Sequence, residues 1–235
     1  MKLLITAGNT QVRLDAVRCL TNIFTGRTGA SIAREAVARG HTVTLLTSHP
    51  ESAPELPSIS YATFEELRDL MAQHVPDADA LIHSAAVSDY LCAGVYAPQQ
   101  ADAFDATTLR WLSPQLLDRA AAKIKSDEPE LWLRLVRAPK LVDLVRSVWG
   151  FRGLLVKFKL EVGCTDQELL ALAERSRQHS QADLMVANTL QGATEWAYLG
   201  PVGEGYERVA RGELARRLLD EIEKRFSREG FSREC

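Results

Sequence analysis

The feature that most constrains the fold is the alternation of short apolar segments with a helical segment along the first 50 residues. Residues 2–8 read KLLITAG, a buried-strand pattern that ends on glycine, and residues 41–49 read HTVTLLTSH, which is rich in β-branched side chains. Between them, residues 29–40 read GASIAREAVARG, which predicts a helix that stops at Gly40. The packed side of this helix is expected to carry Ala30, Ala33, Val37 and Ala38. Strand, helix and strand form a βαβ unit, whose crossover is right-handed in nearly all proteins.

The rest of the chain continues this alternation. Strands are expected at 54–64, 79–90, 130–139, 152–162 and 182–190, and helices at 64–75, 113–124, 140–149, 165–180 and 211–226. Segment 130–139 alternates apolar and charged residues, which predicts a half-exposed antiparallel strand. Thr165 begins a helix with a capping-box pattern. These patterns predict an α/β fold, Rossmann-like and doubly wound, with a mostly parallel sheet and one antiparallel excursion, in a single domain over 1–235.

Composition excludes several classes of protein. Of 235 residues, 46% are hydrophobic and 25% are charged, and the net charge of −3 gives no broad attraction to nucleic acid or anionic membranes. The cysteines and histidines lack the spacings of metal sites, so the cysteines read as reduced thiols. The sequence contains no apolar run near the roughly 20 residues of a membrane span, and its start lacks a signal-peptide pattern. We therefore expect a cytoplasmic protein with no metal held by protein ligands, and with neither nucleic acid nor membrane as a partner.

Ligands of doubly wound folds bind at the carboxyl ends of the strands, so the residues that follow each strand are the candidates for a site. Gly8 follows the first strand, and the turn TGRTG at 25–29 opens the first helix. Backbone N–H groups and the helix dipole at such a turn favour an anion. An alternative of equal weight is that the glycines only let the helix approach the sheet. The segment HSAAVSDY at 83–90 has small side chains that suit either a flat ligand or close packing.

Two charged features stay open to more than one interpretation. Asp89 is placed to meet a ribose hydroxyl or a base amino group, or to form an Asx turn. Lys123 and Lys125 precede an acidic turn, which suits a flap over a phosphate, although a solvated charge run is the more common explanation.

Dehydrogenase chemistry is disfavoured by two missing patterns. No tyrosine is followed four positions later by a lysine, the pair that short-chain dehydrogenases use for proton transfer. The second strand ends LLTSH, without the acidic residue that holds the ribose hydroxyls of NAD.

Six segments occur in the order found in phosphopantothenate–cysteine ligase, the phosphopantothenoylcysteine synthetase of coenzyme A synthesis. They are LLITAGNT (3–10), NIFTGRTG (22–29), AAVSDY (85–90), KIKS (123–126), APKLVDLV (138–145) and ADLMVAN (182–188). Each segment alone is weak evidence, whereas the ordered set is specific and spans almost the whole chain. The chain therefore resembles this family, and the long segment between Asp89 and Lys123 is most similar to the stand-alone bacterial form.

The resemblance implies a reaction in two steps. A nucleoside triphosphate, CTP or ATP, activates the carboxylate of 4′-phosphopantothenate as an acyl-nucleotidylate and releases pyrophosphate, and the amine of L-cysteine then forms an amide. The phosphate charge requires cations, so Mg²⁺ is implied as a cofactor that the phosphates hold. The antiparallel excursion pairs two subunits in this family, which implies a homodimer.

The matched positions imply a role for each candidate residue. Asn22 would hold the acyl-nucleotide intermediate, because a neutral amide donates to a carbonyl or phosphoryl oxygen without adding a base. Lys123 would close a flap on the triphosphate. The implied nucleotide contacts are Gly8, Ala85, Asp89, Lys123, Pro139, Lys140, Leu141, Val142 and Phe158. The implied contacts with the substrate and its phosphate are Asn22, Thr25, Gly26 and Gly29.

The chain departs from the family pattern at several positions. Lys157 replaces a frequent glycine and either crowds the nucleotide or points away, and Thr189 stands in place of a usual aspartate. Arg177 and His179 are the basic residues where some relatives carry lysines that touch the triphosphate. These departures keep open a non-catalytic relative that binds a pantothenate metabolite or a nucleotide. A Rossmann-type oxidoreductase is the least favoured alternative.

Overall fold

The computed structural model describes residues 1–99, 104–112 and 115–228. The chain divides into two compact units. The first unit comprises Met1–Thr10, Ile23–Val87 and Lys140–Cys235, and the second comprises Gln11–Asn22 and Ser88–Pro139.

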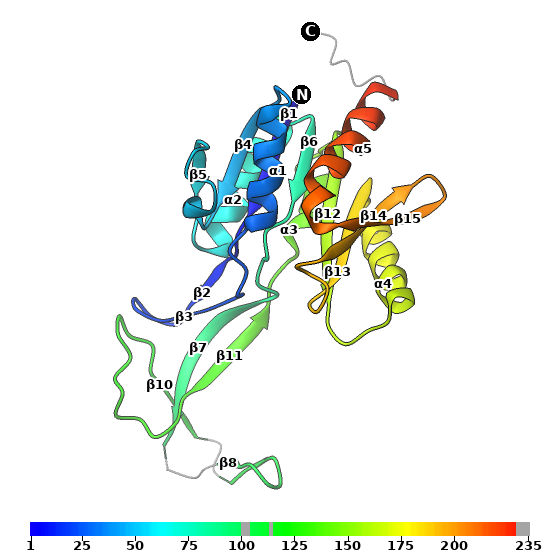
Figure 1. Ribbon diagram of the computed structural model, residues 1–235. Helices are drawn as coiled ribbons and strands as arrows, with labels where there is room; N and C mark the ends of the chain where they lie inside the picture. Colours follow the sequence, from blue (N-terminus) through cyan, green and yellow to red (C-terminus); the bar gives the residue numbers. More distant parts are fainter. Residues whose placement is uncertain (100–103, 113–114, 229–235) are drawn as a thin grey trace. The chain divides into compact units, whose positions relative to one another are not determined.

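The first unit holds an eight-stranded sheet in the order β15-β14-β13-β12-β6-β1-β4-β5 (Figure 1). Its parallel strands are β1 (Lys2–Ala7), β4 (Thr42–Thr47), β5 (Ser58–Ser60), β6 (Ala80–His83), β12 (Leu154–Glu161) and β13 (Leu184–Thr189). Numbered along the chain, these strands lie in the order 3-2-1-4-5-6, that of the doubly wound dinucleotide-binding fold. The predicted fold class is confirmed, and the strand order reverses between β1 and β6.

An antiparallel hairpin that the sequence patterns did not predict extends the sheet beyond β13. It consists of β14 (Trp196–Val202) and β15 (Gly205–Ala210). The expected strand at 79–90 is also shorter than predicted, because β6 ends at His83 and the chain then becomes irregular.

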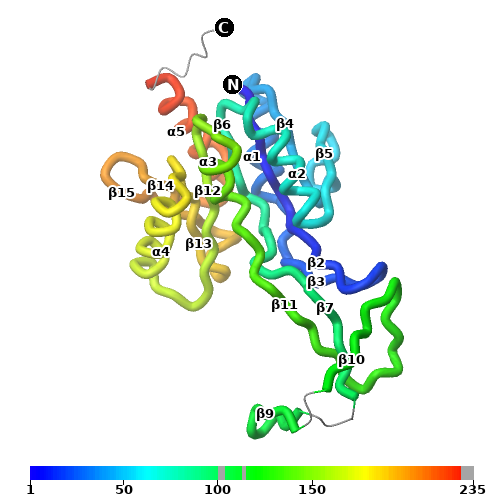
Figure 2. Tube along the Cα trace, turned by 180° about the vertical axis from the view of Figure 1, so that it is seen from behind, coloured from blue at the N-terminus to red at the C-terminus, as the bar shows by residue number. Residues whose placement is uncertain are grey.

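Helices cover both faces of this sheet. One face carries α1 (Arg27–Ala38) and α5 (Leu214–Arg228), and the other carries α2 (Phe64–His74), α3 (Leu141–Ser147) and α4 (Asp166–His179), as the two views in Figures 1 and 2 show. Three short 3-10 turns complete the unit: η1 (Pro50–Ser52), η2 (Val75–Asp77) and η3 (Arg211–Glu213). Alternate residues of each central strand point to opposite faces. Thus Leu184 and Val186 join the core under α1 and α5, whereas Met185 and Ala187 pack against α4.

Helix α1 corrects the predicted packed side. Ala30 and Ala33 are buried as expected, but Val37 and Ala38 are exposed. The buried residues are Gly29, Ala30, Ile32, Ala33 and Ala36. The true stripe runs from Gly29 at helical spacing, and Val37 and Ala38 fall beyond its edge. The predicted stop is confirmed, because Gly40 has a φ of 80° directly after the cap residue Arg39.

The second unit is built from antiparallel strands. Its three-stranded sheet, in the order β10-β7-β11, consists of β7 (Tyr90–Pro98), β10 (Leu116–Asp118) and β11 (Trp132–Arg137). Two hairpins accompany it, β2 (Gln11–Arg13) with β3 (Cys19–Thr21), and β8 (Phe104–Asp105) with β9 (Arg110–Trp111). The rings of Phe104, Trp111 and Trp132 pack together with centroids 4.5–5.4 Å apart. The antiparallel strand predicted at 130–139 is confirmed.

The helix predicted over 113–124 is wrong. Leu116 to Asp118 form β10 instead, and Leu116 and Leu117 pair with Pro98 and Ala97 of β7. Residues 113 and 114 lie outside the described residues. The run of leucine and alanine has helical propensity, but a short isolated helix is marginal in water, and the backbone of this segment pairs with β7 instead.

Three of the four cysteines lie in the described residues. Cys19, Cys92 and Cys164 are free thiols, and Cys235 lies outside the described residues. Across residues 1–99, 104–112 and 115–228, every helix is too short or too polar to cross a lipid bilayer.

Candidate functional site

The strand order of the first unit reverses between β1 and β6, which is where doubly wound folds bind their ligands. Beyond β1, Gly8 to Thr10 run beside the segment that follows β6: the Ala86 N–H donates to Gly8 O at 2.8 Å, and the Thr10 N–H donates to Ala86 O at 3.3 Å. The Ala85 N–H donates to Thr6 Oγ1 at 3.3 Å. The structure therefore brings the predicted residues Gly8 and Ala85 together at the ligand-binding edge of the sheet.

Three glycines bring the N-terminus of α1 onto this edge. A Cβ on Gly26 would lie 2.4 Å from the Gly8 nitrogen, and a Cβ on Gly29 would lie 2.6 Å from Ala7 Cβ and 2.7 Å from Ser84 Oγ. Gly26 is the N-cap of α1, and its φ of 77° suits glycine. This close approach explains the glycines by packing alone. The same approach leaves the first amides of α1 at the strand ends. The predicted anion site is therefore compatible with the packing explanation and stays a prediction.

A cation that the sequence patterns did not indicate lies at the start of α1. Arg211, in η3, donates through its guanidinium to the hydroxyl of Thr28. Burial lowers the pKa of Arg211, although a guanidinium stays charged at neutral pH. Within α1, which is described in full, the first turn carries no acidic residue. The charge of Arg211 therefore adds to the positive end of the helix dipole at the N-terminus of α1.

The end of β4 is neutral and well bonded. The Asn9 N–H donates to Ser48 Oγ at 2.8 Å, and Ser48 Oγ donates to Asn9 Oδ1 at 3.2 Å. A Cβ on Gly8 would meet this hydroxyl at 2.2 Å. The hydroxyl of Tyr61 donates to Ala7 O at 2.6 Å, and burial raises the pKa of that phenol. These hydrogen bonds fix the backbone turn after β1.

Phe158 and Lys157 of β12 point to opposite faces of the sheet. Phe158 is half-buried and packs against the core under α1 and α5. Lys157 is buried, and its Nζ donates to Ser180 Oγ at 2.6 Å and to Ser176 O at 3.2 Å, both at the end of α4. Lys157 therefore points away from Phe158, a predicted nucleotide contact, and toward the end of α4.

The start of α3 contributes three of the predicted nucleotide contacts. Lys140 is the N-cap of α3 and is exposed. The side chains of Leu141 and Val142 are buried in the first unit, so a ligand can reach these residues only through their backbone.

The other departures from the family pattern have structural partners. Thr189 Oγ1 accepts from the Gly192 N–H at 3.2 Å, which shapes the turn after β13. The Arg177 guanidinium makes two hydrogen bonds to Glu174, at 2.7 and 2.8 Å, and a third to Ala182 O at 2.8 Å. Because these contacts hold Arg177 in place, it is a poor substitute for a lysine that reaches out to a triphosphate.

Asn22, Asp89 and Pro139 belong to the second unit. Asn22 directly follows β3 and is half-buried. It is not the cap of α1, since Gly26 holds that position. Asp89 and Pro139 are exposed, and the Ala138 N–H donates to Asp89 O at 2.8 Å, so the ends of β7 and β11 bring these two predicted residues close together.

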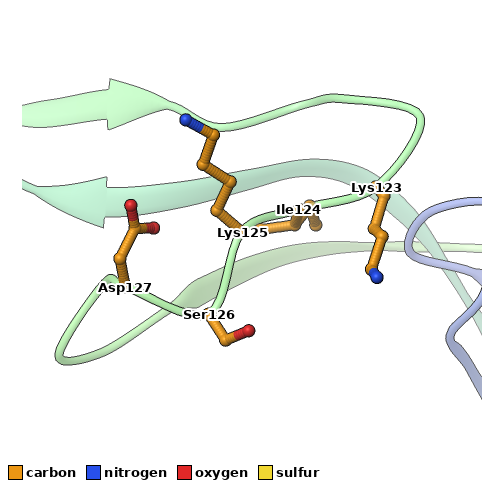
Figure 3. A pocket seen from close by; sticks show the side chains of 5 residues that line it. All are labelled: Lys123, Ile124, Lys125, Ser126 and Asp127. Atoms are coloured by element: carbon orange, nitrogen blue, oxygen red, sulfur yellow. The ribbon is translucent and has the colours of Figure 1, made fainter.

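The predicted flap lysine lies on a hollowed loop of the second unit. A cavity of about 520 Å³ is lined by Lys123, Ile124, Lys125, Ser126 and Asp127 (Figure 3). The side chains of Lys123 and Lys125 extend away from each other, whereas Ile124 is buried and anchors the loop between them. The two lysines therefore face different surroundings.

A clamp from the β2–β3 hairpin holds this loop, and sequence reasoning missed it. Asp15 Oδ2 accepts from Arg18 Nη2 at 2.7 Å and from the Ile124 N–H at 3.1 Å, and Arg18 Nη2 donates to Ile124 O at 2.6 Å. The Arg18 guanidinium is the largest cause that holds the pKa of Asp15 well below its usual range. The only sign of this clamp in the sequence was an aspartate three positions before an arginine. Ile124, to which both side chains bond, lies more than a hundred residues away in the chain.

The predicted site residues thus fall in both units. Those in the first unit are Gly8, Thr25, Gly26, Gly29, Ala85, Lys140, Leu141, Val142 and Phe158, and those in the second are Asn22, Asp89, Lys123 and Pro139. Within the described parts of the chain, no group of three or more histidine, cysteine or acidic side chains is placed to hold a metal ion.

Comparisons with known proteins place this geometry in a family. The family model for the DNA/pantothenate metabolism flavoprotein C-terminal domain matches residues 1–109. The coenzyme A biosynthesis bifunctional protein CoaBC of Thermococcus kodakarensis is 32% identical over 232 residues, which cover 95% of this chain and 51% of that protein. The chain spans about half the length, or less, of the curated relatives it matches.

Two solved structures share the fold. The structure of a Cab2 mutant in complex with phosphopantothenate-cysteine covers 97% of this chain and 88% of its own, with a TM-score of 0.71 and 17% identity, a likeness of fold alone. The DNA/pantothenate metabolism flavoprotein from Streptococcus pneumoniae has a TM-score of 0.78 and 30% identity, and the match covers 95% of this chain and 99% of that one. This match confirms the resemblance seen in the sequence, and the chain belongs to the DNA/pantothenate metabolism flavoprotein family.

Proposed function

We propose that the chain is a phosphopantothenate–cysteine ligase of coenzyme A biosynthesis, which uses CTP or ATP to join 4′-phosphopantothenate to L-cysteine. The observation that carries this proposal is the edge of the sheet where Gly8, Ala85 and the glycine-capped start of α1 meet. The amides of a helix N-terminus bind phosphate groups well, and both substrates of the first step carry phosphates. The relatives' names add coenzyme A biosynthesis and phosphopantothenate-cysteine to this chemistry.

The proposed chemistry has two steps. A carboxylate oxygen of phosphopantothenate attacks the α-phosphorus of the nucleotide, and the bond to the bridging oxygen breaks, so that pyrophosphate leaves with the electron pair. The amine of cysteine then attacks the acyl carbon, loses a proton, and displaces the nucleoside monophosphate. A carboxylate is a poor electrophile, so the first step supplies the leaving group that the second step needs.

The side chains would act mainly through electrostatics and positioning. The amide of Asn22 would donate to an oxygen of the acyl-nucleotidylate, and Lys123, on its exposed loop, would neutralise charge on the triphosphate. A Mg²⁺ ion held mainly by the phosphates would add charge neutralisation there. The mixed anhydride reacts with water, so a loop that covers it would protect it.

We also propose a cytoplasmic homodimer that associates through the second unit. The support is the edge strand β11, which carries the exposed Leu135.

A non-catalytic binder of a pantothenate metabolite or a nucleotide is the second candidate. The bonds that hold Arg177 to Glu174 favour it, because they remove a cation from reach of a triphosphate.

One assay separates the candidates. The protein is incubated with phosphopantothenate, Mg²⁺ and either CTP or ATP, with and without cysteine, and pyrophosphate and the amide product are measured. Pyrophosphate that forms only when the acid is present, and amide that forms only with cysteine, would support the ligase. Saturable binding of the acid or the nucleotide without turnover would support the binder and reject the ligase.

A further inference from the structure

Lys157 is a buried cation that the proposed chemistry does not use. Its side chain is 8% exposed and crosses from β12 to the last turn of α4. The pKa of Lys157 is lowered to about 8, mainly by burial; the charge of Asp143 opposes the shift, and the charges of Lys140 and Lys159 contribute to it. A buried ammonium ion needs acceptors for its protons, and this one has two, the carbonyl of Ser176 and the hydroxyl of Ser180.

The hydroxyl of Ser180 connects Lys157 to α3. Ser180 is 4% exposed, accepts from Lys157 at 2.6 Å, and donates to Asp143 Oδ1 at 2.8 Å. The three groups form a continuous relay in which the ammonium donates to the hydroxyl and the hydroxyl donates to the carboxylate. The relay joins three elements of the first unit: β12, the cap of α4 and the first turn of α3.

Asp143 lies where its charge and position matter to a ligand. It belongs to the first turn of α3, and its N–H donates to Lys140 O at 3.0 Å. The helix that precedes a strand in a right-handed crossover begins at the carboxyl edge of the sheet, where ligands of this fold bind. A carboxylate at that edge with no partner would repel a triphosphate, whereas one bonded to Ser180 and balanced by Lys157 is held in place and compensated.

We propose that Lys157 is a positioning residue: through Ser180 and Asp143 it fixes the first turn of α3, and with it the backbone of Lys140–Val142, for nucleotide binding. The nucleotide part of this inference rests on the proposed ligase function. The relay itself rests on the hydrogen bonds alone, so the two parts can fail separately.

The proposal predicts a pH dependence. The charged or titratable groups around Lys157 are His83 on β6, Asp143 and Lys140 on α3, Lys159 on β12 and His179 at the end of α4. Burial and the charge of Lys157 lower the pKa of His83 to about 4, so His83 is neutral above pH 6. As pH rises from 7 to 9, Lys157 loses its proton and Asp143 loses its balancing charge. The KM for the nucleotide should therefore rise over this interval.

The test compares Lys157→Met and Ser180→Ala with the parent and with a matched control, Arg146→Gln. Arg146 bonds Asp183 at 2.7 Å and Gly153 O at 2.9 Å, so it ties down the other end of α3 without touching the relay. The first readout is hydrogen exchange of the amides of residues 143–145 at fixed pH, which needs no activity. The second is exchange of labelled pyrophosphate into the nucleotide, with phosphopantothenate and Mg²⁺ but without cysteine, so that the cysteine amine does not titrate in the assay.

Both relay variants should speed amide exchange in the first turn of α3, and Arg146→Gln should not. At pH 7, Lys157→Met should raise the KM for the nucleotide by about tenfold with the exchange turnover within about twofold, the signature of lost binding rather than lost chemistry. Its KM should then stay flat from pH 7 to 9, whereas that of the parent rises.

Three results would overturn parts of this inference. Unchanged amide exchange in both relay variants would reject the relay. Faster amide exchange with a parental KM and pH profile would reject its role in nucleotide binding. A parent protein without pyrophosphate exchange would reject the ligase function and the nucleotide part with it, while amide exchange would still decide whether the relay holds α3.

Discussion

At the scale of single residues, Lys123 and Lys125 differ although two positions separate them. Both are exposed, but their side chains extend away from each other on the loop that lines the cavity (Figure 3). If Lys123 neutralises developing charge on the phosphates, Lys123→Gln should lower turnover by about 100-fold, the effect of losing one preorganised electrostatic contact. Lys125→Gln is the matched control and should lower turnover far less. Equal losses in steady-state assays would show a general charge effect instead.

Asn22 tests the mechanism more directly. Asn22→Asp keeps the size of the side chain but replaces a donor with a negative charge beside the proposed phosphates. The structure assigns the cap of α1 to Gly26, so α1 does not depend on Asn22 for a cap. We expect ligase activity to be almost lost while the free energy of unfolding falls by only about 1 kcal/mol or less. Product formation near the parental rate would rule out a catalytic role for Asn22.

His83 predicts how stability depends on pH. The pKa of His83 is lowered to about 4, mainly by burial and to a smaller extent by the charge of Lys157. In the unfolded chain the pKa of a histidine is near 6.5. Between these values the unfolded chain binds a proton that the folded chain does not, so the free energy of unfolding falls as pH drops from 6.5 to 4. The loss should be about 3 kcal/mol for this group.

Urea unfolding at pH 6.5 and 4.5 checks the prediction for His83, with His83→Gln as the comparison. Acidic groups with lowered pKa values, such as Glu174 at about 2, also weaken the fold in acid, and they act equally in both proteins. The parent should therefore lose more stability than the variant between these pH values. Equal losses would contradict a buried neutral His83.

At the scale of elements, Asp15 and Arg18 of the β2–β3 hairpin hold the loop at residues 123–127, which carries Lys123 and Lys125. Asp15→Asn would remove the charge that bonds Arg18 and weaken the grip on Ile124. Losing charge-assisted hydrogen bonds of this kind should lower kcat by about tenfold and speed amide exchange at residues 122–126. The matched control is Asp105→Asn. Asp105 bonds Thr107 and Thr108 within the β8–β9 hairpin.

The control separates this effect from a general loss of stability. If Asp105→Asn slows the enzyme as much as Asp15→Asn does, or if amide exchange at residues 122–126 does not change, the clamp has no specific role.

At the scale of the whole molecule, the three-stranded sheet predicts self-association. Strand β11 is at the edge of the sheet as the described residues define it, and Leu135 on it is 42% exposed. An edge strand with apolar side chains is a liability in a monomer, and a two-fold partner would cover it. We expect a dimer mass by light scattering at micromolar concentration, and a shift toward monomer in Leu135→Lys. Val148→Lys, at a 66% exposed position in the first unit, should leave the mass unchanged. A monomeric parent would reject the dimer.

Much of the fold was determined by the sequence itself, because its signals are local. The alternation of buried strands and helices predicted the doubly wound sheet, and Thr165 with Glu168 predicted a capping box that the structure contains. Gly8, Gly26, Gly29 and Ala85 were placed correctly at one edge, since parallel strands end on the same side of a sheet. Each of these inferences needs only neighbouring residues and one general rule of packing.

Features that depend on contacts between residues far apart in the chain could be seen only in the folded structure. Leu116 and Leu117 are strand residues because β7 pairs with them, although their own neighbourhood favours a helix. The face to which Lys157 points, its relay to Asp143, and the grip of Asp15 on Ile124 also appear only in the folded chain. A buried charge needs hydrogen-bond or ion-pair partners, and the fold can supply them from any part of the chain. The spacing of residues along the sequence does not show which distant residues will lie next to that charge.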